Sequence, residues 1–169
     1  MNMIIPFVME FQHETGSTRK LLERLPDEHF NWTPHEKSMP LGDLASHMAE
    51  LVVWARPTVE QDELVLDPAT YQPWKGKNIA EVIAKFDENV TDALSVLNGQ
   101  TDEHLMQPWS LKVGETTVFT LPRIAVLRSF CLNHQIHHRG QLTVYARLKG
   151  VALPQIYGPT ADEPNMAPA

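Results

Sequence analysis

The sequence contains a single cysteine, Cys131, among its 169 residues. One cysteine cannot form an internal disulfide, and it excludes zinc fingers and iron–sulfur clusters that are held by several thiolates. Basic residues are also few, because 14 Lys and Arg stand against 21 Asp and Glu and give a formal net charge of −7. A chain of this charge is a poor candidate for general binding to nucleic acid or to an anionic membrane surface. We therefore expect no nucleic-acid partner.

Long apolar runs are missing as well. No stretch approaches the roughly 18 uninterrupted apolar residues of a membrane span. The opening residues, MNMIIPFVMEFQHE, lack a basic segment and soon turn acidic, which makes them a poor signal peptide. We expect a protein of a reducing cytoplasm that does not associate with membranes. The length and the hydrophobic content of 43% are ordinary for a globular protein, so we predict one domain over residues 1–169.

The sequence also lacks any segment that reads convincingly as a strand of a sheet, whereas four segments show the apolar spacing of amphipathic helices. In each of them apolar residues recur every three or four positions. The predicted helices cover residues 4–25, 40–57, 79–97 and 121–149. Four helices with one apolar face each can bury those faces against one another, and we therefore predict an all-α four-helix bundle.

Helix ends and connections add detail to this prediction. Asn78 and Glu81 form a variant of the capping box, Gly99 and Gly150 are stop signals, and Pro57 ends or kinks the second helix. The connection over residues 56–77 is long enough to cross the bundle from end to end. The next connection contains a segment that can form a small hairpin around Gly114, and the tail over residues 151–169 is Pro-rich and irregular.

Eight histidines in so short a chain call for an explanation. His134 and His138 are four residues apart, so they lie one above the other on the apolar side of the fourth helix. His47 also falls on an apolar face, that of the second helix. Three imidazoles from two facing helices would form a metal site with an open position for water or substrate, as in catalytic zinc sites. The alternative is that the three are hydrogen-bonded core residues without a metal.

The other histidines are weaker candidates. His137 points about 100° away from His138 on a helix and is at most a neighbour of the site. His13 belongs to a Glu-x-x-His string that is typical of di-iron bundles, but it falls on the polar side of the first helix. The remaining three lie in connecting segments, where solvent-exposed histidines are common: His29, His35 and His104.

Several of these residues belong to strings that resemble the DinB-like family, the DNA-damage-inducible four-helix-bundle metalloproteins. The resemblance implies an up-down-down-up bundle, with the long crossover between the second and third helices. It also implies a divalent metal, most often zinc or nickel, on His47, His134 and His138, and frequent homodimers. The strings that carry it are Trp32-Thr-Pro34, Leu44-Ala-Ser-His47, His134-Gln-Ile-His-His138-Arg-Gly-Gln-Leu142 and the tail from Leu153 to Glu163.

Related branches of the family include transferases and isomerases that depend on low-molecular-weight thiols, so our leading hypothesis is a metal-dependent enzyme of the thiol-transferase or hydrolase type. Such an enzyme would act on a small-molecule substrate, with a thiol as a further cosubstrate. The catalytic residues are unknown, with three candidates. Gln141 and Tyr145 follow His138 on nearly the same face, and Glu50, one turn after His47, is the third and could accept a hydrogen bond from a ligand histidine. We expect Arg139 to bind a carboxylate or the tail. The alternative function is a non-enzymatic metal-binding or stress-response protein.

Overall fold

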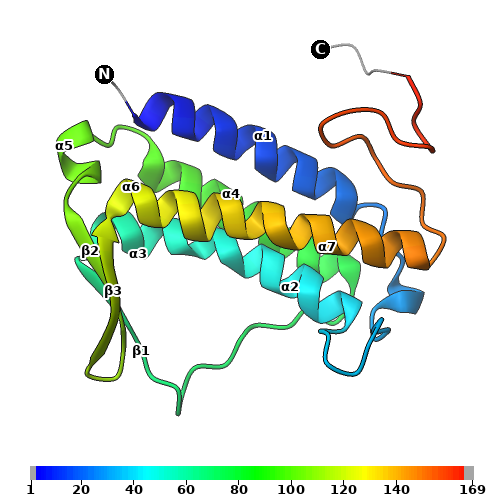
Figure 1. Ribbon diagram of the computed structural model, residues 1–169, viewed down its shortest axis with the longest axis horizontal. Coiled ribbons are helices and arrows are strands. Elements are labelled where there is room, and N and C mark those ends of the chain that lie inside the picture. The colour runs from blue at the N-terminus through cyan, green and yellow to red at the C-terminus, as the bar shows by residue number, and fades with distance from the viewer. Residues whose placement is uncertain (1–2, 166–169) are drawn as a thin grey trace.

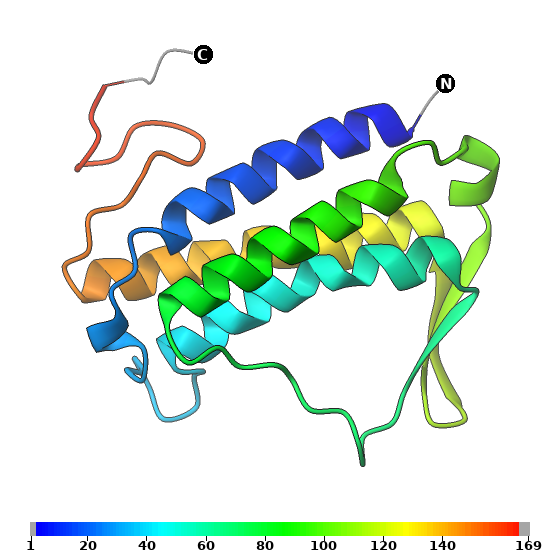
Figure 2. The same ribbon diagram turned by 180° about the vertical axis from the view of Figure 1, so that it is seen from behind.

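The structure, a computed structural model, describes residues 3–165 of the chain. Four helical stretches lie side by side along its long axis (Figure 1). The first and the last stretch run in one direction and the two others run in the opposite direction, as Figure 2 shows from behind. The stretches are α1 (Ile4–Leu22), α2 (Leu41–Leu51) with η2 (Val52–Trp54) and α3 (Ala55–Glu60), α4 (Ile79–Leu97), and α6 (Arg123–Val126) with η3 (Leu127–Asn133) and α7 (His134–Leu148).

The predicted signals at the ends of α4 are present in the structure. The Asn78 side chain accepts a hydrogen bond from the backbone N–H of Glu81 at 2.8 Å. The Glu81 carboxylate in turn accepts from the backbone of Lys77, one residue earlier than in the standard capping box. Gly99, just beyond the helix, has a φ of +83°, which glycine adopts without steric cost.

The second stretch differs from a plain helix at Pro57. The chain tightens into the 3₁₀ segment η2 before the proline and then continues as α3 through Glu60, beyond the predicted end. Proline has no N–H, and its ring crowds the carbonyl four residues earlier, so an α-helix cannot pass through it undisturbed. The first helix also departs from its prediction, because α1 ends at Leu22 rather than at residue 25.

The last stretch is continuous but irregular. It begins two residues later than predicted, because Leu121 and Pro122 belong to a strand and Arg123 is the first helical residue. Between α6 and α7 lies η3, a π-helical segment of 7 residues. Segments of this kind are frequent at functional sites, and η3 ends directly before His134.

The prediction of an all-α fold is wrong in one respect, because a small sheet packs at one end of the helices. β2 (Pro108–Val113) and β3 (Thr116–Pro122) form the predicted hairpin, with Gly114 at a φ of +56°. β1 (Glu63–Leu66) lies in the long connection after α3 and pairs with β2 in parallel, so the strand order is β1-β2-β3. The rest of the long connection runs along the lower edge of the molecule in Figure 2 and ends at the start of α4.

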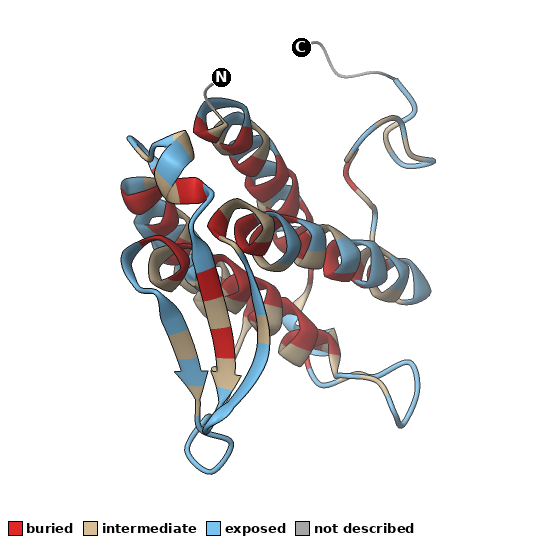
Figure 3. Ribbon diagram, turned by 60° about the vertical axis from the view of Figure 1, so that its left-hand side comes forward, coloured by how far each residue is buried: buried red, intermediate tan, exposed pale blue. Residues whose placement is uncertain are grey.

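The core lies between the helices, whose facing sides are buried whereas most of the sheet is exposed (Figure 3). Cys131 belongs to this core, as its place in the apolar pattern predicts. Two short helical turns complete the fold, η1 (Asp27–His29) and α5 (Asp102–Leu105). None of the helices within residues 3–165 combines the length and the apolar composition needed to cross a membrane.

Candidate metal centre

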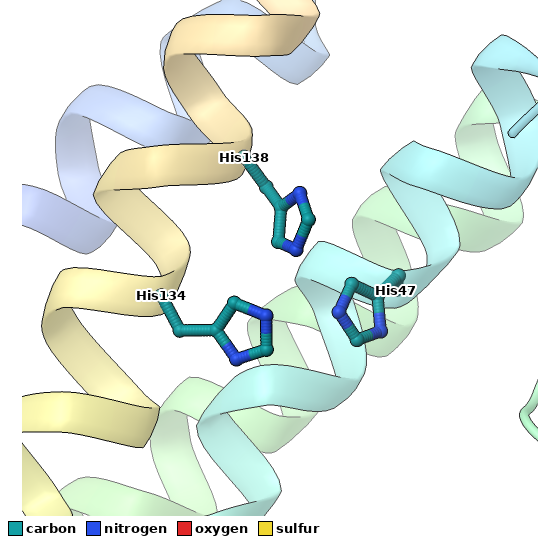
Figure 4. Close-up of side chains that lie close together, drawn as sticks. All are labelled: His47, His134 and His138. Carbon is teal, nitrogen blue, oxygen red and sulfur yellow. The ribbon is translucent and has the colours of Figure 1, made fainter. Parts of the chain in front are cut away.

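The structure brings together the three histidines that the sequence singles out. His47 projects from α2, and His134 and His138 project from α7, toward the same point between the two helices (Figure 4). The ring of His47 lies 5.2 Å from that of His134 and 4.8 Å from that of His138, centroid to centroid, and the last two rings are 4.7 Å apart. One ring nitrogen from each residue lies within 4.8 Å of the others.

All three imidazoles favour the neutral form, which is the form that binds a metal. Burial, together with smaller contributions from His138 and His134, lowers the pKa of His47 from 6.5 to about 4. Burial is also the main reason why the pKa values of His134 and His138 lie below their usual range. At neutral pH the cluster therefore presents nitrogen lone pairs rather than positive charges.

Gln141 orients one of these rings. Its side-chain oxygen lies 2.7 Å from Nδ1 of His138. An amide oxygen can only accept, so Nδ1 carries the proton and the lone pair is left on Nε2, the nitrogen that faces the other two histidines (Figure 4). Hydrogen bonds of this kind fix the tautomer and the ring orientation of metal-ligating histidines. The sequence placed Gln141 near the site but did not predict this contact.

Tyr145 and His138 both line a cavity of about 220 Å³. The ring of Tyr145 meets Trp32 edge to face, with the centroids 5.8 Å apart. Lys37 and Ser38, from the loop before α2, line the same cavity. Two of the three predicted catalytic candidates, Gln141 and Tyr145, are therefore beside the histidine cluster. A larger cavity of about 690 Å³ lies between the start of α1 and the loop after α4, and no histidine lines it.

Glu50 does not contact the histidines, contrary to the expectation that it would support His47. One of its carboxylate oxygens accepts a hydrogen bond from the backbone N–H of Trp74 at 2.8 Å. The carboxylate faces a different cavity, lined also by Trp54 and Tyr71. Glu50 follows His47 by about one turn of α2, and the hydrogen bond from Trp74 holds its carboxylate toward this other cavity instead of toward the histidine.

Arg139, directly after His138, anchors a second polar cluster. Its guanidinium is 2% exposed and donates to the carboxylate of Glu14 at 2.5 Å and to the hydroxyl of Tyr157 at 2.5 Å. Tyr157 donates in turn to Glu14 at 2.8 Å. The arginine thus binds both a carboxylate and the tail, as expected. Glu14 was missed, although its position on the apolar stripe of α1, between Phe11 and Thr18, was a signal for a buried charge.

The five other histidines stay outside the cluster. His13 is exposed on α1, and His137 is exposed although its ring lies 4.9 Å from that of His138. His104 differs from the expectation of a solvated loop residue, because it belongs to α5 and its Nε2 lies 2.8 Å from the carbonyl oxygen of Val59. His29 is half-buried in η1, and His35 is exposed and its Nδ1 accepts a hydrogen bond from the backbone of Lys37.

The model of the DinB family matches residues 2–167, which is nearly the whole chain. The chain belongs to the DinB family. DinB membership agrees with the resemblance seen in the sequence and with the mostly helical fold of four main stretches. It does not define the reaction, because one fold hosts many activities.

Individual proteins resemble this chain over most of its length. The chain is 28% identical over 158 residues to the uncharacterized protein YrdA of Bacillus subtilis (strain 168), an alignment that covers 93% of this chain and 89% of YrdA. The crystal structure of a DinB-like protein from Bacillus cereus ATCC 10987 superposes with a TM-score of 0.70 at 25% identity, covering 89% of this chain and 95% of the other. The DinB-like protein YjoA of B. subtilis has a similar fold, with a TM-score of 0.68 at 22% identity over 92% of this chain and 98% of YjoA.

Proposed function

We propose that this DinB protein binds one divalent metal ion through His47, His134 and His138 and uses it in catalysis. The observation that carries the proposal is the three-imidazole cluster itself, with ligand atoms within 4.8 Å of one another. Within residues 3–165, only His138 among the three has a hydrogen-bond partner. Neutral imidazoles that are partly buried and lack protein partners need another ligand, and a metal ion satisfies all of them at once.

The donor set suits a catalytic rather than a structural ion. Structural zinc sites use four protein ligands, whereas catalytic sites use three and leave a position for water or substrate. No cysteine or carboxylate joins the three histidines in the part of the chain that the structure describes. Imidazole ligands suit zinc and nickel among other ions, and we propose one of these two. When bound, such an ion lowers the pKa of a bound water or thiol and stabilises the resulting anion.

The chain's own residues point to a thiol that comes from outside. Cys131 is the only cysteine, and burial raises its pKa to about 12, so it supplies no thiolate at neutral pH. This observation supports a low-molecular-weight thiol as cosubstrate, with a thiol-transferase or a hydrolase as the class of enzyme. The cavity beside His138 would hold the small-molecule substrate, oriented by the Tyr145 hydroxyl and the Lys37 ammonium. Gln141 would keep the His138 ring in place.

A homodimer of single-domain chains in the cytoplasm remains part of the proposal. Exposed apolar side chains that a second copy would cover stand at the start of α1 (Ile5 and Met9) and, at the opposite end of the bundle, near the end of α7 (Val144 and Leu148). Light scattering after size-exclusion chromatography measures the mass directly. A mass of one chain at all concentrations would contradict the dimer without affecting the metal site.

Metal analysis of the purified protein tests the site. We expect about one equivalent of zinc or nickel per chain in the wild type. His138→Ala should lose the ion, whereas His13→Ala, a matched change of an exposed histidine, should keep it. A wild-type protein that takes up no divalent ion on titration, or a His138→Ala protein that binds it as tightly as the wild type, would overturn the proposal.

The enzymatic part requires a separate experiment. The metal-loaded protein is screened with low-molecular-weight thiols against electrophilic acceptors, and with activated esters and amides for hydrolysis. We expect turnover that His47→Ala abolishes and His13→Ala retains. If the loaded protein turns over none of them, the non-enzymatic metal-binding alternative becomes the better description.

A further inference from the structure

A second cavity, which the metal site does not use, lies between the α2–α3 stretch and strand β1. Its volume is about 240 Å³, and most of its lining is apolar or aromatic. Leu64 and Leu66 form one wall, Trp54 and Tyr71 form others, and Glu50 contributes the only carboxylate. A compact apolar cavity with one polar group is the usual form of a small-molecule site.

The fold holds the walls of this cavity in place. Residues of a strand alternate between its two faces, so Leu64 and Leu66 of β1 point the same way while Val65 between them is exposed. Trp54 stacks on Phe130 of η3 with 4.9 Å between ring centroids and 12° between the planes. The walls formed by β1 and by Trp54 are therefore held by the fold, whereas Tyr71, which is 54% exposed in the connection after β1, closes the cavity from the surface.

Glu50, which lines this cavity, has one carboxylate oxygen without a hydrogen-bond partner among the described residues. Its Oε1 accepts from the backbone of Trp74, but its Oε2 is buried and has no partner within residues 3–165. Burial raises the pKa of Glu50, and the nearby Glu50 charge contributes to the raised pKa of Tyr71. A carboxylate oxygen that is shielded from water without a donor is costly, so the site is built for a donor that this part of the chain does not supply.

The charge around the cavity indicates which donor fits. No Lys, Arg or His is among the described residues that line it; Lys85 is near enough to lower the pKa of Glu50, but its ammonium is paired with Glu88 at 3.0 Å. An anionic ligand would meet the charge of Glu50 and be repelled. A cation would gain from that carboxylate and from the electron-rich faces of Trp54 and Tyr71.

We propose that this cavity binds a small organic ammonium ion with an apolar body. The ammonium group pairs with the Glu50 carboxylate and lies against the aromatic rings, and the apolar body packs on Leu64 and Leu66. The proposal goes beyond the metal site and does not depend on a bound metal. It does place the ligand near the histidine cluster, because Glu50 follows His47 by about one turn of α2.

Benzylamine is the probe that tests this site, with benzyl alcohol and benzoate as matched neutral and anionic probes. Binding is measured by calorimetry and by the NMR shift of the Trp54 indole N–H, assigned with a Trp54→Phe variant, in metal-free and metal-loaded protein. We expect benzylamine to bind in both forms and to shift the Trp54 signal. Benzyl alcohol should bind about tenfold more weakly, since it lacks the charge-assisted bond, and benzoate should not bind.

Two variants separate the charge from the shape of the cavity. Glu50→Gln keeps an oxygen for the Trp74 N–H but removes the charge, so benzylamine should bind about tenfold more weakly or worse while the melting temperature is retained. Val53→Trp should fill the cavity from its exposed side and block all three probes. Glu60→Gln, an exposed carboxylate on α3 that pairs with Arg56, is the control and should bind like the wild type.

Three results would overturn the proposal. They are benzylamine binding that Glu50→Gln leaves unchanged, benzyl alcohol or benzoate binding as tightly as benzylamine, and no binding of benzylamine to the wild type up to about 10 mM, the range of weak fragment affinities. Failure of the metal site would appear instead as an absence of bound ion, with benzylamine binding unaffected.

Discussion

His138 and Arg139 are neighbours on α7, yet they enter two polar clusters of opposite character. The guanidinium of Arg139 is buried and both of its terminal nitrogens donate to groups of the chain, with Glu14, Thr18 and Tyr157 as partners. The histidine cluster has one internal hydrogen bond, from His138 to Gln141, and its other ring nitrogens find no protein partner in the described part of the chain.

The difference shows which cluster serves the fold and which is kept for a ligand. A buried charge that is paired and hydrogen-bonded on all sides holds elements together and offers nothing to a substrate. Imidazoles that are partly desolvated, neutral and unpaired are costly for the fold and suited to a metal. Changes in the first cluster should therefore alter stability, and changes in the second should alter ligand binding.

The largest effect on stability is expected from Glu14→Ala. This change leaves the Arg139 charge buried without its carboxylate, which typically costs about 3–5 kcal/mol. Urea unfolding measures the loss. Glu10→Ala, which removes a half-exposed ion pair between α1 and Arg128, is the control and should cost about 1 kcal/mol or less. Equal losses in the two variants would contradict the assignment of the Arg139 cluster to the fold.

Metal binding should stabilise the wild type and leave the histidine variants unchanged. A ligand present at about a hundredfold excess over its dissociation constant stabilises the folded state by about 2.7 kcal/mol. We expect the melting temperature of the metal-free protein to rise on addition of zinc or nickel, and His47→Ala to show no such rise. A rise of the same size in His47→Ala would place the ion elsewhere.

Gln141→Leu should weaken metal binding without unfolding the protein. It removes the acceptor that holds Nδ1–H of His138, and losses of such partners typically reduce metal affinity by about 10- to 100-fold. Competition with a chromophoric chelator measures the affinity. Gln141→Glu retains an acceptor and serves as the matched control, and its affinity should stay close to that of the wild type.

The smallest effect is a dependence of metal-free stability on pH. The pKa of His47 is about 4 in the folded protein and near 6.5 in the unfolded chain, so the unfolded chain takes up a proton first as the pH falls. This contribution to stability is complete above about pH 6.5 and is lost as the pH falls toward 4. Urea unfolding at about pH 7.5 and pH 5 in the presence of a chelator should show it. His47→Ala should have a flatter profile than the wild type.

Much of the fold could be predicted from the sequence because the signals for helices and turns come from residues that are close together in the chain. The cap at Asn78, the turn at Gly114 and the apolar spacing of the four helical stretches depend on neighbouring residues, and the structure has them. The strand β1 has almost no signal in its own sequence, since its four residues are ordered by pairing with β2, more than forty positions away. An α-helical period also cannot reveal the π-helical turn in η3.

The candidate site also has a part that the sequence predicts and a part that it does not. The helical pattern predicted His47, His134 and His138 as site residues, because two of them share one helix face and the third lies on an apolar stripe. The orientation of single side chains was harder to predict, since it depends on what packs nearby. Glu50 points to another cavity, and Gln141 binds a histidine ring, and neither contact follows from sequence distance alone.

The π-helical segment before His134 has a consequence for how the site can change. Each residue turns an α-helix by about 100°, and a π turn absorbs one additional residue without breaking the helix. If the same seven residues of η3 formed a regular α-helix, α7 would be rotated relative to α6 by roughly that angle, carrying His134 and His138 away from α2. The π-helical conformation of this segment, as much as the identity of its residues, thus sets which face of α7 meets His47.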